Sequence, residues 1–263
     1  MRKFALNLAF VCVLGFAPTA LQAAQAATRP ATTIVLVHGA FAESASWDGV
    51  ITDLVAHGYH VVAAAIPMRG LASDAAIVSG LVNSIDGPVI LVGHSYGGAV
   101  ITDIANNKGN VIGLVYVAGL APSLGESASD LTKRFPGSTL GRALAPPVIL
   151  ADGSKDLYIQ QSKFNAQFAA DVPAWQATQM AATQRPIAAA ALAEPSGPPS
   201  WKSLPSWFIY GSADKNIPPA VQPFMAARAD ARKVVELKGA SHSVMVSHPH
   251  EVALLIEQAA SAR

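Results

Sequence analysis

The sequence predicts an α/β protein with a mostly parallel sheet flanked by helices and a helical lid insertion. Apolar, β-branched runs alternate with stretches whose apolar residues recur at helical spacing, which is the pattern of strands joined by crossover helices. The alternation stops at about residues 123–205 and then resumes, so about 80 residues interrupt the sheet. Because a connection of this length is too long for a bare loop, we interpret it as a lid over the active site, with a merely structural helical excursion as the open alternative.

The predicted strands are short and mostly apolar, as expected for strands buried on both faces of a parallel sheet. We expect strands at residues 32–37, 60–65, 89–92, 111–117, 207–210 and 233–237. Helical spacing is found at residues 46–58, 73–85, 99–105 and 220–229, and from 249 onward. Ser73 is the expected N-cap of the second of these helices, and Pro249 is a favourable first-turn residue for the last.

The insertion is rich in Pro, Gly, Ser and Ala, and three further helices are predicted within it. They cover residues 126–135, 160–170 and 174–193. Asp152-Gly153 indicates a turn, which could close a small hairpin.

Residues 1–26 have the pattern of a signal peptide. Arg2-Lys3 is followed by a short apolar run, and the triplet Ala24–Ala26 fits an A-x-A cleavage site. Cleavage near Ala26 would leave residues 27–263 as one domain, periplasmic or secreted by a bacterium, with no stable membrane association. An uncleaved membrane anchor is the open alternative, although the apolar run is short for a membrane span.

Charge and cysteine content exclude several classes of function. The chain has 18 Lys and Arg against 17 Asp and Glu, and no basic stripe that would bind nucleic acid. Its single cysteine, Cys12, lies in the predicted signal peptide, so a disulfide framework and a thiolate metal site are both excluded. We expect no metal, no cofactor and no nucleic-acid partner, and the oligomeric state stays open.

The stretch Val89–Gly98 carries the strongest chemical signal. A predicted strand runs into Gly93-His94-Ser95-Tyr96-Gly97, and a predicted helix follows. This context makes G-x-S-x-G a nucleophile elbow, with the serine at the apex of a sharp turn. The glycines on either side let strand and helix approach closely. Ser95 is therefore the predicted nucleophile.

A serine nucleophile needs a general base, and the base needs an acid that orients it. In this kind of fold the acid and then the histidine follow the serine along the chain. Asp214 and His242 each follow a predicted strand, so both should lie at the same sheet edge as Ser95. Asp230, shortly before the last predicted strand, is the rival acid.

An oxyanion hole and a substrate pocket should adjoin the nucleophile. The backbone N–H groups of Tyr96 and Ala40 are the expected donors, with Phe41 in reserve, because Gly39 allows a close approach. Packing of the insertion on itself is an equally open reading for its apolar residues. Candidate pocket residues are Phe41, Leu157, Phe164, Phe168, Trp175 and Met180.

Over residues 32–260 the chain resembles the α/β-hydrolase superfamily, and within it small bacterial esterases and plant methylesterases and hydroxynitrile lyases. The lyases of this branch carry Thr where this chain has Gly39 and Lys where it has Ser243, so the resemblance implies an esterase rather than a lyase. The supporting stretches are Leu36–Ala40 with Trp47, Val92–Gly98, Asp214–Pro218 and Lys238–His242.

The sequence thus predicts a serine-type carboxylic-ester hydrolase that acts on a small or medium, fairly apolar ester through an acyl-enzyme on Ser95. One alternative is other chemistry on the same triad: lactone or amide hydrolysis, carbon–carbon bond hydrolysis, perhydrolysis or a lyase reaction. A more distant alternative is a non-catalytic ligand-binding protein on a hydrolase scaffold.

Overall fold

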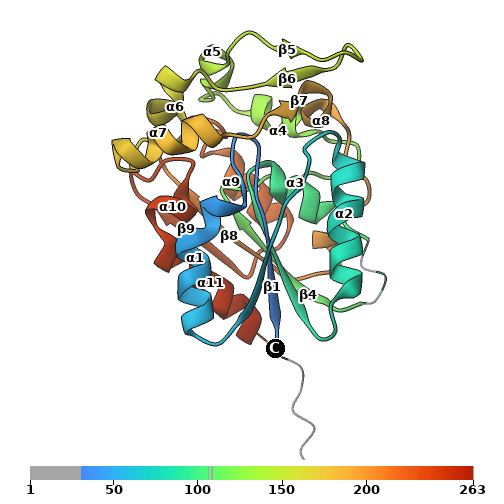
Figure 1. The fold of residues 1–263 in the computed structure, drawn as a ribbon. Coiled ribbons are helices and arrows are strands. Elements are labelled where there is room, and N and C mark those ends of the chain that lie inside the picture. The colour runs from blue at the N-terminus through green and yellow to red at the C-terminus, as the bar shows by residue number, and fades with distance from the viewer. Residues whose placement is uncertain (1–30, 106, 108, 263) are drawn as a thin grey trace, which may run out of the picture.

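The computed structural model describes residues 31–262 apart from 106 and 108, and the predicted signal peptide at 1–26 lies outside the described residues (Figure 1). The main sheet has six strands in the order β2-β1-β3-β4-β8-β9, and every neighbouring pair is parallel. This confirms the predicted fold class. The strands are β1 (Thr33–Val37), β2 (His60–Ala64), β3 (Val89–His94), β4 (Val111–Val117), β8 (Ser206–Gly211) and β9 (Lys233–Leu237).

Helices cover both faces of this sheet. Alternate residues of β1 show how the core divides: Ile34 and Leu36 pack in one buried cluster, while Val35 and Val37 pack in another. The first cluster includes α1 (Asp48–Ala56), α10 (Val244–Ser247) and α11 (Pro249–Ser261). The second includes α2 (Leu71–Ser84), α3 (Tyr96–Thr102) and α9 (Val221–Arg228).

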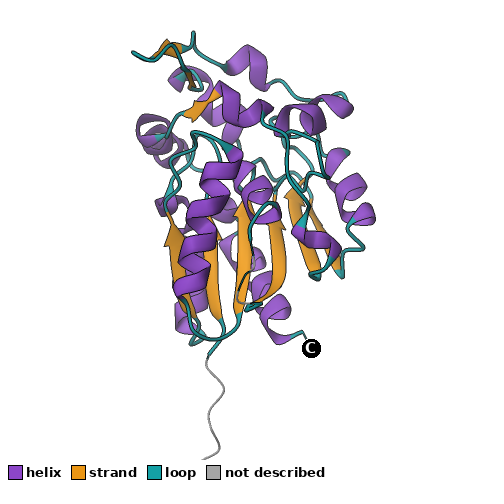
Figure 2. Cartoon of the chain, turned by 90° about the vertical axis from the view of Figure 1, so that its right-hand side faces the viewer, coloured by secondary structure: helices purple, strands orange, loops and turns teal. Residues whose placement is uncertain are grey.

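The insertion between β4 and β8 lies beyond the carboxyl ends of the strands (Figures 1 and 2). The Asp152-Gly153 turn lies between its antiparallel strands β5 and β6, in agreement with the predicted hairpin. A role of the insertion as a lid stays a prediction. Its elements are α4 (Ala128–Arg134), α5 (Leu140–Ala143), β5 (Val148–Ile149), β6 (Lys155–Leu157), α6 (Gln161–Phe168), α7 (Ala174–Thr183), β7 (Ile187–Ala188) and α8 (Ala189–Ala193).

The helix predicted over residues 174–193 is broken in the structure. The chain leaves α7 at Thr183, forms β7, and becomes helical again only in α8. Pro186 lies in the break. Because proline disfavours the helical conformation of the residue before it and cannot donate a backbone hydrogen bond, it accounts for the interruption.

The start of α2 also differs from the prediction. The helix begins at Leu71, and its N–H groups at Leu71 and Ala72 donate to the carboxylate of Glu194 at 2.6 and 3.2 Å. Glu194, at the end of α8, therefore satisfies two unpaired donors and places a negative charge at the helix N-terminus. Ser73 is not the N-cap, since its hydroxyl donates to the Gly70 carbonyl.

Candidate active site

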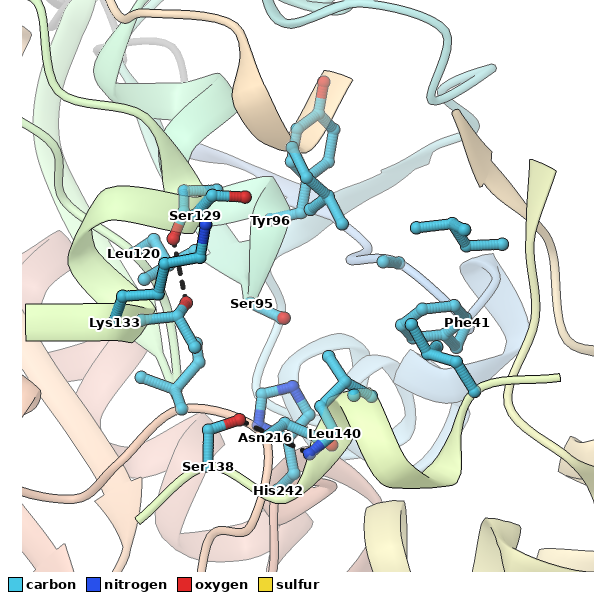
Figure 3. Close-up of a pocket in the computed structure, with 18 of the residues that line it drawn as sticks. Phe41, Ser95, Tyr96, Leu120, Ser129, Lys133, Ser138, Leu140, Asn216 and His242 are labelled. Atoms are coloured by element: carbon cyan, nitrogen blue, oxygen red, sulfur yellow. Dashed lines mark hydrogen bonds between the residues drawn. The ribbon is translucent and has the colours of Figure 1, made fainter. Parts of the chain in front are cut away.

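Ser95 occupies a sharp turn between β3 and α3. Its φ of 53° and ψ of −120° are strained for a residue with a side chain, as in a nucleophile elbow. A Cβ atom at Gly93 would lie 2.4 Å from the Gly97 carbonyl oxygen, so the strand and helix can meet here only with glycine. The turn leaves the Ser95 side chain at the wall of a cavity, where Figure 3 shows its hydroxyl facing the open space.

Asp214 and His242 are brought together by the loops that follow β8 and β9. His242 Nδ1 and Asp214 Oδ2 are 2.6 Å apart, and both side chains are 1% exposed. Asp214 Oδ1 accepts the backbone N–H groups of Asn216 and Ile217 at 2.7 and 3.0 Å, which fixes the orientation of the carboxylate. With Nδ1–H donating to Asp214, the Nε2 atom of His242 is free to act as a base toward Ser95, which lines the same cavity.

Two other buried histidines, His38 and His94, lie near the site and hydrogen-bond to backbone groups. His94 donates from Nε2 to the His242 carbonyl at 3.2 Å, and His38 Nε2 accepts the N–H of Ile66 at 3.2 Å. Burial lowers the pKa of His38 and lowers that of His94 well below its ordinary value. Both rings are therefore neutral at neutral pH, and each holds its backbone partner by a hydrogen bond.

The buried, neutral His94 should make the protein sensitive to acid. Below about pH 6.5 His94 is protonated in the unfolded chain but stays neutral in the folded chain, so stability falls as the pH falls. Glutamine keeps a hydrogen-bond donor but does not titrate. As the pH falls, we therefore expect His94→Gln to lose about 1.4 kcal/mol less of its free energy of unfolding per pH unit than the wild type. Urea unfolding between about pH 8 and pH 5 measures it. Parallel stability curves for the two proteins would contradict the expectation.

The expected oxyanion donors also lie at the cavity. Ala40 and Tyr96 both line it beside Ser95, and Tyr96 is the first residue of α3, where backbone N–H groups lack helical partners. The Phe41 N–H donates to the Arg185 carbonyl at 3.1 Å, so this reserve donor is already engaged. Of Ala40 and Phe41, Ala40 is therefore the better placed to donate its N–H group to an oxyanion.

Asp74 is a site-supporting residue that the sequence prediction missed. It is fully buried in α2, where Oδ2 accepts the Tyr96 hydroxyl at 2.8 Å and Oδ1 accepts the Met68 N–H at 3.1 Å. Burial raises the pKa of this carboxyl group, and the hydrogen bond from Tyr96 opposes the shift. The contact anchors the Tyr96 side chain next to Ser95. An aspartate inside an apolar helix face is the sequence signal that could have pointed to it.

Gly39 packs directly against Ser95, the predicted nucleophile. A Cβ atom at this position would lie 2.6 Å from Ser95 Cβ and 2.7 Å from the His94 carbonyl oxygen. We expect Gly39→Ala to lower kcat/KM for an ester by about 10–100-fold, because the backbone around Ser95 must shift to admit the methyl group. Gly80→Ala is the control, since no atom outside its chain neighbours and its own helix backbone lies within 4 Å of its Cβ position in α2. Equal activity of both variants would contradict this.

A cavity of about 600 Å³ opens onto Ser95 and His242 (Figure 3). Of the predicted pocket residues, Phe41, Leu157 and Phe168 line it. Helices α4 and α5 of the insertion contribute walls that the sequence did not reveal. Further apolar walls are Leu120, Ala128, Phe135, Leu140, Leu144, Leu192 and Ile217. Polar groups on the rim and walls are Ser129, Thr132, Lys133, Ser138 and Asn216.

Three predicted pocket residues lie elsewhere. Phe164 is fully buried behind the wall, with its ring centroid 4.9 Å from that of Phe168. Trp175 is 66% exposed on α7. Met180 lines a second cavity, which lies between α7 and the loop after β1. These three residues are not among those that line the cavity at Ser95. The prediction failed for them because the spacing of apolar residues does not reveal which way a helix of the insertion faces.

Neither a membrane helix nor a metal cluster is found in the described part of the chain. Within residues 31–262, leaving out 106 and 108, no helix is long and apolar enough to cross a membrane. The same residues hold no group of three or more His, Cys, Asp or Glu side chains that could bind a metal ion.

A parallel sheet with a serine elbow and a buried Asp–His pair at its carboxyl edge defines a hydrolase of the α/β type. The chain belongs to the alpha/beta hydrolase family, whose model matches residues 34–254. It is similar to the alpha/beta hydrolase nvfD of Aspergillus novofumigatus, with 23% identity over 247 residues that cover 86% of this chain and 96% of the relative.

Two solved structures share the fold. The pyrethroid hydrolase of Sphingobium faniae JZ-2 is 24% identical, with a TM-score of 0.70, and the match covers 88% of this chain and 98% of the other. Polyneuridine aldehyde esterase is 19% identical, with a TM-score of 0.72, and the match covers 87% and 98%. At these identities the likeness is one of fold.

Proposed function

We propose that this protein is a serine-type carboxylic-ester hydrolase that works through an acyl-enzyme on Ser95, without a cofactor. The observation that carries the proposal is the convergence of three features at one cavity. Ser95 lies in a strained elbow, the buried His242–Asp214 pair lies beside it, and the walls around both are mainly apolar.

The mechanism follows from the roles of these groups. His242 Nε2 takes the hydroxyl proton as Ser95 Oγ attacks the ester carbonyl, and Asp214 stabilises the imidazolium that forms. The N–H groups of Ala40 and Tyr96 bind the oxyanion. The C–O bond then breaks, His242 returns its proton to the departing alcohol, and the acyl group stays on Ser95. Water, deprotonated by His242, attacks the acyl carbon and releases the acid and the serine.

The cavity favours small or medium, fairly apolar esters. Its volume of about 600 Å³ is within the range of small-molecule sites, and its walls near Ser95 are aromatic and aliphatic. Two neighbours in fold are by name a pyrethroid hydrolase and an esterase, which agrees with ester chemistry. Aryl and methyl esters are therefore the first substrates to test.

A substrate panel tests the proposal. Purified protein is assayed with p-nitrophenyl acetate, butyrate and octanoate, with methyl esters, with lactones and with anilides. We expect the highest kcat/KM among the aryl and methyl esters. Faster turnover of a lactone or an amide than of every ester would favour other chemistry on the same triad. Ligand binding with no turnover of any compound would favour the non-catalytic alternative.

The structure gives a reason to place the lyase alternative lower. Ser243, at the position where the related lyases carry Lys, is fully buried, and its hydroxyl donates to the Phe168 carbonyl at 2.9 Å. It contributes no group to the cavity. At Gly39, where the lyases carry Thr, any side chain would collide with Ser95 Cβ. Both positions therefore lack the groups that the lyases use.

We further propose that the protein is exported, with cleavage near Ala26. The support is the basic, apolar and small-residue pattern of residues 1–26. Mass spectrometry of the protein purified from a bacterial periplasm or medium should find an N-terminus at Ala27 or a close neighbour. A mature protein that begins at Met1 would contradict the proposal.

A further inference from the structure

The C-terminal end of α6 lies where two loops meet. The acid loop follows β8 and carries Asp214, and the base loop follows β9 and carries His242. Two consecutive residues of this helix, Gln167 and Phe168, bond to different loops: the first to the loop that follows Asp214, the second to the loop that holds His242. The helix belongs to the insertion, not to the sheet scaffold that carries the triad.

Gln167 holds the acid loop. The residue is 7% exposed, and its Nε2 donates both to the Lys215 carbonyl at 2.9 Å and to Asn216 Oδ1 at 2.8 Å. Its Oε1 accepts the Thr139 hydroxyl at 2.8 Å, so the amide is fully engaged. Asn216 in turn donates its backbone N–H to Asp214 Oδ1 at 2.7 Å. The Gln167 side chain is therefore linked to the Asp214 carboxylate through one intervening residue, Asn216.

Phe168 holds the base loop. Its carbonyl oxygen accepts the hydroxyls of the two residues that flank His242, at 2.9 Å from Ser243 and 3.4 Å from Ser241. Ser241 also donates to Asp171, just beyond the helix. The Phe168 ring stands edge-on to His242 at 5.0 Å between centroids and lines the cavity. The backbone and the ring of one residue thus confine the imidazole.

We propose that the end of α6 sets the geometry of the Asp214–His242 pair, and that Gln167 is a positioning residue for the reaction. Gln167 is not among the residues that line the cavity, and it reaches the site only through its hydrogen bond to Asn216. It acts by keeping the acid loop in register with the base loop that Phe168 fixes. Displacements of about 1 Å in a catalytic group can cost about 100-fold in rate, so this register matters for turnover. The inference rests on the triad of the proposed function.

Gln184 provides a matched control. It is also a buried glutamine of the insertion, 9% exposed, with Nε2 donating to the carbonyls of Ile159 and Ala181, each at 2.9 Å. Its Oε1 accepts the Ile159 N–H at 2.9 Å. Like Gln167, it therefore donates two hydrogen bonds and accepts one, but none of its hydrogen bonds reaches the loop of Asp214 or the loop of His242. Methionine keeps the shape of both side chains and removes their polar groups.

The test compares Gln167→Met with Gln184→Met. Both should lower the melting temperature by similar amounts. We expect only Gln167→Met to lower kcat for an aryl ester, by about 10–100-fold at nearly unchanged KM. The same variant should move the acidic limb of the kcat/KM profile to lower pH, because a displaced Asp214 stabilises the His242 imidazolium less. Equal kcat values and equal pH profiles for the two variants would overturn the inference.

A second readout does not depend on turnover. The proton between His242 Nδ1 and Asp214 should give a downfield NMR signal in the wild type and in Gln184→Met. It should be shifted or lost in Gln167→Met. If Gln167→Met fails to fold, Ser243→Ala takes its place. That variant removes a hydrogen bond to Phe168 and should move the same signal. An unchanged signal in both Gln167→Met and Ser243→Ala would refute the positioning role. A wild type that shows the signal but hydrolyses no ester would instead refute the proposed function.

Discussion

Ser95→Ala is expected to lower kcat for ester hydrolysis by about 10⁴–10⁶-fold. Without the hydroxyl, no acyl-enzyme can form, and only the oxyanion donors and the binding of the ester in the cavity remain. Steady-state assays with p-nitrophenyl acetate, using enough enzyme to see the residual rate, give the ratio.

The variant should otherwise keep the structure of the wild type. Alanine replaces serine at the same strained φ of 53° and leaves the glycine contacts of the elbow in place. Circular dichroism and binding of an unreactive ester analogue are the controls. Turnover within tenfold of the wild type by folded Ser95→Ala would show that the hydrolysis occurs elsewhere.

Asp214→Asn should lower kcat by about 10⁴-fold with little effect on KM. The amide can still accept the N–H groups of Asn216 and Ile217 through its oxygen, which turns its NH₂ group toward His242 Nδ1. That group donates where the carboxylate accepted. It therefore favours the tautomer in which Nε2 carries the proton and cannot act as the base.

Asp230→Asn is the matched comparison, because Asp230 is the rival acid by sequence. Asp230 is exposed beyond the end of α9 and has a φ of 48°, a conformation that asparagine also accepts. We expect its activity to equal that of the wild type. A steep loss in Asp230→Asn, with an active Asp214→Asn, would reverse the assignment of the acid.

The sheet and the elbow could be predicted because their signals are local. Runs such as Val111–Val117 appear as strands at the predicted residues, and glycine, serine and glycine at fixed spacing encode the turn at Ser95. Asp214 and His242 follow from a rule of topology, since loops after parallel strands gather at one edge of the sheet. Pairing these two residues required no knowledge of the insertion.

The features that escaped prediction depend on partners far along the chain. Glu194 caps a helix that begins 123 residues before it, and Gln167 bonds to Asn216 at a separation of 49 residues. Composition does not reveal such pairs. The same limit applies to Trp175 and Met180: an apolar residue on a short helix can face the cavity, a neighbouring helix or solvent, and tertiary packing decides which.

Covalent labelling tests the central claim, that Ser95 is an activated nucleophile, most directly. The wild type, Ser95→Ala and Asp214→Asn are incubated with a fluorophosphonate, and the modified peptide is located by mass spectrometry. We predict one adduct on Ser95 in the wild type, much slower labelling of Asp214→Asn, and no adduct on that peptide in Ser95→Ala. An unlabelled Ser95 in wild-type protein that hydrolyses esters, or equal labelling of Ser95→Ala at another residue, would contradict the account.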